Sequence, residues 1–134
     1  MLAFKELVAL GASVCGGMSL GALWYGPLFG KTWAKAVGMT DKKPTKNWVR
    51  HAILVTFLAV LFGACITIRL STMLQLETLF DRIQLALALT LLSMSHTLLA
   101  ADWKPTRITV VQAIDIGFHA SLLLIAATMH FVFV

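Results

Sequence analysis

The sequence predicts an all-α integral membrane protein, a four-helix bundle of transmembrane helices with short loops. Of its 134 residues, 59% are hydrophobic and only 13% are charged, whereas soluble domains carry about 25% charged residues. The mean hydropathy is +0.86. The apolar residues also gather in four stretches that approach the ~17–25 residues that a helix needs to cross a bilayer.

These stretches are expected to form one transmembrane domain over residues 1–134. The first is too long in its apolar part, and too weakly basic at its start, for a cleaved signal peptide. It ends where Gly26 and Pro27 stop the helix and Lys31 marks the aqueous side. The four expected helices cover residues 7–28, 51–68, 83–101 and 108–134.

The connections between the expected helices differ in length. Residues 31–50 are expected to form the longest polar loop, and residues 69–82 a loop that continues as a short interfacial turn. Residues 102–107 make a tight connection, which would hold the last two helices as antiparallel neighbours.

Charge predicts the orientation of the chain. Most of the 11 Lys and Arg residues fall in the loops at 31–50 and 102–107, and basic loops stay on the cytoplasmic or matrix side. Both termini are therefore expected on the outer, lumenal or intermembrane side of a bacterial plasma membrane or mitochondrial inner membrane. This pattern also explains the net charge of +5. A nucleic-acid partner is not expected, because no basic face or aromatic platform for bases is present.

The first segment carries small residues at a spacing of four. Ser13, Gly17 and Gly21 share one helix face, and Gly17 with Gly21 matches the GxxxG pattern. In lipid, such a groove lets two backbones approach closely and supplies van der Waals contact. The expected partner is another helix of the same chain, with a partner protein or a second copy as the alternative.

The last segment carries a polar stripe. Gln112, Asp115, His119 and His130 fall within about 60° of one helix face. An ionisable side chain in hydrocarbon costs about 2.5–3.5 kcal/mol on insertion scales, so it normally faces a partner or a water-filled cavity. Asp115 and His119 are four residues apart, which suits a charge-assisted hydrogen bond. His130 lies near the far end, where an interfacial role is expected.

His96 is expected to meet this stripe. It lies about as far before the tight connection as Asp115 lies after it, so antiparallel helices would place the two side chains at a similar depth. The expected intramembrane polar cluster is His96, Gln112, Asp115 and His119.

Several interpretations of this cluster stay open. The first is a satisfied polar network that locks two helices together. The second is a proton or ion relay, and the third is a site for haem or a chlorophyll-type pigment. A metal ion would lack a third ligand, and no strained nucleophile turn accompanies Ser93 or Ser95. We therefore expect no enzyme, no catalytic or metal-binding residue, and no cofactor other than bound lipid.

An aromatic run closes the first segment. Trp and Tyr favour the lipid–water boundary, so the run indicates a well-anchored helix exit. The alternative is a docking surface, since aromatic residues are enriched in binding hot spots. The run comprises Trp24, Tyr25, Gly26, Pro27, Phe29 and Trp33.

Two motifs resemble the membrane-protein family known as domain of unknown function 1761. The family pattern at the end of the first helix is G-x-x-W-Y-x-P-x-x-F-G-x-x-W. It is matched by Gly21, Trp24, Tyr25, Pro27, Phe29, Gly30 and Trp33, with one residue fewer between Pro27 and Phe29. The Trp103-Lys104-Pro105 turn, followed by Asp115-Ile116-Gly117-Phe118-His119, resembles the second half of the family. The resemblance implies a four-helix integral membrane protein and no assigned activity.

The chain is thus expected to be an accessory or structural subunit of a larger energy-transducing membrane complex, such as a respiratory complex. It is minimal, and its loops are too short to hold a soluble site. Its partners would be lipids and other membrane subunits, with a homo-oligomer as a further assembly. The main alternative is a small oligomeric transporter, or a proton or ion channel protomer, that uses the Asp/His stripe. A membrane-embedded enzyme or cofactor binder is the third class.

Overall fold

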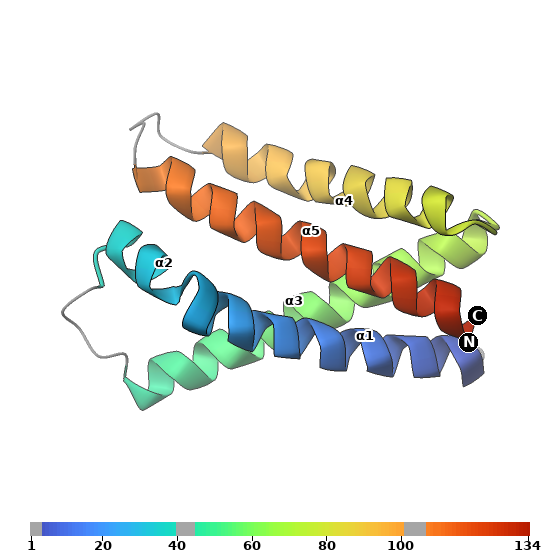
Figure 1. Ribbon diagram of the computed structural model, residues 1–134, viewed down its shortest axis with the longest axis horizontal. Coiled ribbons are helices and arrows are strands. Elements are labelled where there is room, and N and C mark those ends of the chain that lie inside the picture. The colour runs from blue at the N-terminus through green and yellow to red at the C-terminus, as the bar shows by residue number, and fades with distance from the viewer. Residues whose placement is uncertain (1–3, 40–44, 101–106) are drawn as a thin grey trace.

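The computed structural model describes residues 4–39, 45–100 and 107–134, and the side chains of all these except 95–100 and 107–109. This part of the chain is all-helical, with five α-helices, one π-helical turn and no strand, which confirms the predicted all-α class. Figure 1 shows the elements in order: α1 (Phe4–Leu23), η1 (Trp24–Leu28), α2 (Gly30–Ala36), α3 (Lys46–Met73), α4 (Leu79–Ala100) and α5 (Arg107–Phe133).

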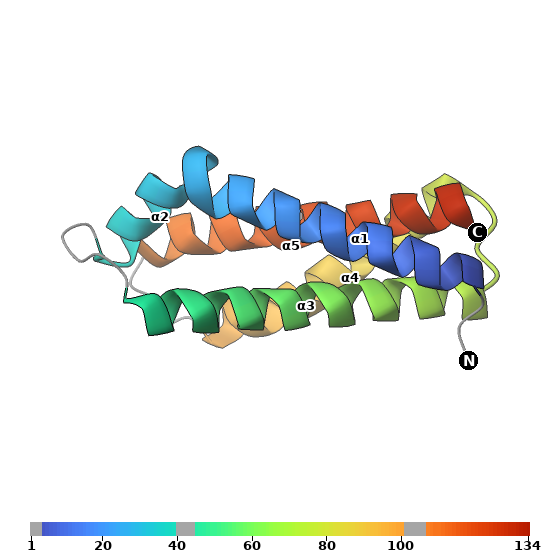
Figure 2. The same cartoon turned by 90° about the horizontal axis from the view of Figure 1, so that it is seen from below.

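Helix α5 is the centre of the bundle. It packs against α1, α3 and α4, and it also contacts the short helix α2. Figure 1 shows α1 and α4 on either side of α5, and Figure 2 shows α3 in a second layer. The beginning of α1 and the end of α5 lie at one end of the bundle, and α2 lies at the other end (Figure 1).

Three helical segments of the described chain are long and apolar enough to cross a membrane. They are Phe4–Leu28, Lys46–Met73 and Val110–Phe133, which agrees with a membrane protein. The predicted count of four helices is not confirmed, because the described residues form five α-helices and α4 is not among the three candidate spans. The side of the membrane that the termini face stays a prediction.

The polar loop expected over residues 31–50 is largely helical instead. It contains α2, which ends at Ala36 and is followed by Gly38, where a positive φ of 76° suits glycine. It also contains the start of α3, because the Thr45 side-chain oxygen accepts a hydrogen bond from the Trp48 amide at 3.2 Å. Such a cap satisfies one of the free N–H groups at a helix start. Helix α3 therefore begins before the expected boundary at His51.

The loop expected to begin at residue 69 also starts later. Helix α3 continues through Arg69, which is exposed, since a long basic side chain can extend away from an apolar helix surface. The chain turns only at Gln75, whose φ is 52°. Thr78 then caps α4, because its hydroxyl oxygen accepts a hydrogen bond from the Asp81 amide at 3.1 Å. The predicted tight connection at 102–107 lies outside the described residues, apart from Arg107.

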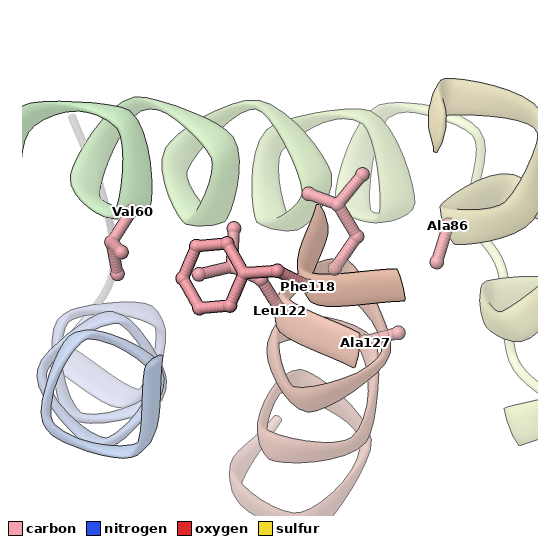
Figure 3. Close-up of a cluster of buried hydrophobic side chains, with 6 residues drawn as sticks. Val60, Ala86, Phe118, Leu122 and Ala127 are labelled. Atoms are coloured by element: carbon pink, nitrogen blue, oxygen red, sulfur yellow. The ribbon is translucent and has the colours of Figure 1, made fainter. Parts of the chain in front are cut away.

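The apolar core forms around α5. Figure 3 shows Phe118 and Leu122 of α5 near Val60 of α3, with Ala127 on the side of Ala86 from α4. All five side chains are buried. The core therefore joins α3, α4 and α5 through residues from the middle of each helix.

Small residues let α1 approach this core closely. Ser13, Gly17 and Gly21 are all buried. A Cβ atom on Gly17 would lie 2.7 Å from Val60 Cγ1 and 2.9 Å from Leu122 Cδ1, distances that real Cβ contacts do not show. The small-residue face of α1 is therefore in contact with α3 and α5 of the same chain.

Candidate functional site

A sharp bend at the end of α1 sends two aromatic side chains toward α5. The Phe29 amide donates to the Trp24 carbonyl at 2.8 Å, which closes a wide π-helical turn around Pro27. Gly26 leaves the helical region, with φ −98° and ψ −106°. A side chain on Gly30 would collide with the Tyr25 carbonyl oxygen. The aromatic run therefore bends and continues as α2 (Figure 1).

Trp24 and Tyr25 both bind α5, some ninety residues further along the chain. The Trp24 indole Nε1 donates to the Ile114 carbonyl at 3.0 Å. The Tyr25 hydroxyl donates to Asp115 Oδ1 at 2.7 Å. Gly117 makes room for the indole, because a Cβ atom there would lie 2.9 Å from Trp24 Cζ2. The first motif that resembles the family thus contacts the Asp115 to His119 part of the second.

Aromatic rings extend this contact across four elements. The Tyr25 ring lies 5.2 Å from Phe118 of α5 and 6.1 Å from Trp33 of α2, both edge-on. Trp33 in turn lies 6.5 Å from Trp48 at the start of α3. Edge-on and tilted pairs at such distances are favourable for aromatic rings. The row links η1, α2, α3 and α5 at the α2 end of the bundle.

A groove of about 910 Å³ opens beside this row. The carboxyl of Asp115, the amide of Gln112 and the imidazoles of His51 and His119 line it. Asp115 is the only Asp, Glu, Lys or Arg among the described lining residues. The rest of the lining is apolar apart from the hydroxyl groups of Tyr25 and Thr56 and the indole N–H groups, and comprises Met18, Gly21, Ala22, Tyr25, Trp33, Trp48, Ala52, Ile53, Val55, Thr56, Ala59, Val60, Met94, Phe118 and Leu122.

The structure brings together three members of the expected polar cluster. Gln112, Asp115 and His119 face the same groove. The expected side-chain bond between Asp115 and His119 is wrong, because His119 Nδ1 lies 3.0 Å from the Asp115 main-chain oxygen, while the carboxyl accepts from Tyr25. The side chain of His96 lies outside the described residues.

His130 does not join the groove. It lies at the other end of α5, as expected, and its side chain is only 1% exposed; its interfacial role stays a prediction. No three His, Cys, Asp or Glu side chains in the described part of the chain come together to hold a metal ion.

One protein family matches most of the chain. A family model described as "Protein of unknown function (DUF1761)" matches residues 8–131. The chain belongs to this family. No curated protein and no solved structure matches the chain. The description of the DUF1761 family assigns no activity, so the function of this member has to be argued from its groove.

Two lining residues of this DUF1761 member had no functional interpretation from the sequence. His51 and Trp48 lie in the first two turns of α3, and in the sequence they have the character of ordinary boundary residues. Both line the groove because α3 begins at Lys46 and turns this face toward α2. The feature of the sequence that could have identified them is their helical spacing, which places them on one face with Ala52, Val55 and Thr56.

Proposed function

We propose that this protein is a small membrane transporter, or a protomer of one, that takes an organic cation into the groove at Asp115. This is the transport alternative that the sequence left open. The active form would be an oligomer, because a bundle this small barely encloses a path across a membrane.

The observation that carries the proposal is the position of Asp115. Its carboxyl lines a groove whose other described residues include no fixed charge. Asp115 also lies within a candidate membrane span, where ionisable side chains usually mark a substrate or ion pathway. Aromatic faces beside a carboxylate favour an organic cation through cation–π attraction. The aliphatic part of the lining suits the apolar portion of such a molecule. An amphipathic cation therefore matches both the carboxylate with its aromatic neighbours and the aliphatic part of the lining.

Two surfaces that an accessory subunit could offer to a partner protein, the small-residue face of α1 and the aromatic run, make contacts within the chain. Gly17 and Gly21 lie against α3 and α5, and Trp24 and Tyr25 are hydrogen-bonded to α5. The accessory-subunit hypothesis stays a prediction.

The proposal is tested by ethidium entry into proteoliposomes that enclose DNA, where binding to DNA raises the fluorescence of ethidium. We expect entry several-fold faster with the full-length protein than in protein-free liposomes. Asp115→Asn should return entry to the protein-free rate. The amide oxygen of Asn can still accept from Tyr25, so this variant removes the charge and retains the bond. Glu77→Gln is the matched control, since it removes an exposed acid far from the groove and should leave entry unchanged.

Equal entry with and without the protein would contradict the proposal. So would an Asp115→Asn variant that folds and transports like the original chain. If the native protein also migrates with a large membrane complex, the accessory-subunit hypothesis would replace transport.

A further inference from the structure

A second polar cluster lies at the opposite end of the bundle and shares no residue with the groove. It gathers the first turn of α1, the end of α3, the start of α4 and the end of α5. Glu6 is 4% exposed, Arg82 is 8% exposed and His130 is 1% exposed. Burying ionisable groups is costly unless they are paired or functional. Three such groups from three helices therefore call for an explanation.

A hydrogen-bond chain connects two of these groups. The Thr72 hydroxyl oxygen lies 2.7 Å from Glu6 Oε1 and 3.3 Å from His130 Nε2. A hydroxyl has one proton to donate, so it can donate to the Glu6 carboxylate while it accepts from the His130 Nε2–H group. The chain then runs from α5 through α3 to α1. The Ile68 carbonyl, 3.1 Å from the same hydroxyl, is a competing acceptor within α3.

The cluster is not fully satisfied as a purely structural network would be. Three buried polar atoms, Ser71 Oγ, Arg82 Nη1 and His130 Nδ1, have no hydrogen-bond partner among the described residues. Buried polar atoms in native proteins are nearly always paired. His130 Nδ1 is therefore an atom that can take up a proton without breaking a bond that the fold depends on.

Two opposite charges face His130. Helix α1 presents the Glu6 carboxyl, which favours a protonated imidazole, and α4 presents the Arg82 guanidinium, which opposes it. Arg82 is fixed in place, because its Nε donates to the Leu76 carbonyl at 2.9 Å and its guanidinium lies 5.5 Å from the centre of the Phe131 ring. Helix α3 contributes two hydroxyl groups, from the buried Ser71 and the exposed Thr72, while its Arg69 is exposed. Opposing charges of this kind allow a site both to bind a proton and to release it.

We propose that Glu6, Thr72 and His130 form a proton-binding site in which one proton is shared between the imidazole and the carboxyl. In the transfer, the Nε2–H bond of the imidazolium breaks and its proton goes to Thr72 Oγ1. The Thr72 hydroxyl proton goes at the same time to Glu6 Oε1. The products are a neutral imidazole with its proton on Nδ1, a restored hydroxyl and a neutral carboxylic acid, so the net charge of the site is unchanged. This site is independent of the transport role proposed for the groove.

The test is a pH titration of the full-length protein, labelled with ¹⁵N-histidine and held in lipid nanodiscs, followed by NMR. The His130 signals are assigned by their loss in His130→Gln. We expect His130 to titrate in two steps, because coupled groups share macroscopic titrations. Thr72→Val should reduce this to one step, whereas Thr72→Ser, which restores the hydroxyl, should keep two.

Two results would overturn the proposal. One is a His130 signal that does not change with pH in the original chain. The other is a Thr72→Val variant that is folded and titrates as the original does. If Thr72→Val does not fold, Glu6→Gln decides the matter: a single step supports the shared site, and two steps contradict it.

Discussion

The hydrogen bond from Tyr25 to Asp115 joins the two motifs of this chain at a single pair of atoms. The side chains are ninety residues apart in the sequence and 2.7 Å apart in the structure. Hydrogen bonds to charged groups contribute more to stability than neutral ones. The bond therefore has two effects: it holds the bent end of α1 on α5, and it fixes the direction of the carboxyl that lines the groove.

Removing the hydroxyl should weaken the fold measurably. We expect Tyr25→Phe to lower the free energy of unfolding by about 1–3 kcal/mol, because the carboxyl loses its donor. Unfolding in mixed detergent micelles measures this change. A double-mutant cycle with Asp115→Ala, which removes the acceptor, should show strong non-additivity, since both changes act on one bond. Unchanged stability, or simple addition of the two effects, would show that the bond is not important for the fold.

Sequence patterns predicted part of this site at the level of residues. Helical periodicity correctly placed Gln112, Asp115 and His119 on one face, because that periodicity is local. The partner of Asp115 could not be found in the same way. Tyr25 reaches it only because η1 bends back, and that bend depends on Gly26, Pro27 and Gly30 acting together. Local patterns also favoured His119 as the partner, although its ring lies against the main chain.

The helices themselves are held together by close backbone approach. Two glycines of α1, Gly17 and Gly11, have different surroundings. A Cβ atom on Gly17 would meet Val60 and Leu122 at less than 3 Å, whereas one on Gly11 would meet nothing within 4 Å. Because membrane helices gain little from burying apolar surface against each other, this close packing is a main source of their association.

The two glycines provide a matched pair for a test. We expect Gly17→Ala to lower the free energy of unfolding by about 1–3 kcal/mol, the usual cost of overpacking a core. Gly11→Ala adds the same methyl group to the same helix, and it should be neutral or slightly stabilising, because alanine favours a helix more than glycine does. Thermal unfolding in detergent compares them. Equal stability of the two variants would contradict the packing described for α1.

At the level of elements, the sequence predicted the long helices better than their ends. Long apolar runs determine that a helix forms, but capping residues determine where it begins and ends. The Thr45 cap lets α3 begin at Lys46, before the predicted start. The chain turns at Gln75, after α3 ends at Met73. The sequence also missed α2, because Gly30 to Ala36 is short and polar, and such a segment becomes helical only when Trp33 packs against Tyr25.

The whole molecule has two polar sites at opposite ends of an apolar core. The groove at Asp115 lies at the α2 end, and the Glu6–Thr72–His130 site lies where α1 begins and α5 ends. The buried residues between them, such as Val60, Phe118 and Ala127, are apolar. The sequence predicted a polar stripe along α5 with His130 near its far end, and the structure places Asp115 in the groove and His130 in the second cluster.

The proposed transport requires that the groove bind an organic cation through Asp115. The most direct test is calorimetric titration of the purified full-length protein in detergent with tetraphenylphosphonium, using empty micelles to correct for partitioning. We predict saturable binding that Asp115→Asn weakens at least about tenfold, or about 1.4 kcal/mol, and that Glu77→Gln leaves unchanged. Binding equal in the original chain and in Asp115→Asn, or no binding beyond that of empty micelles, would contradict the claim.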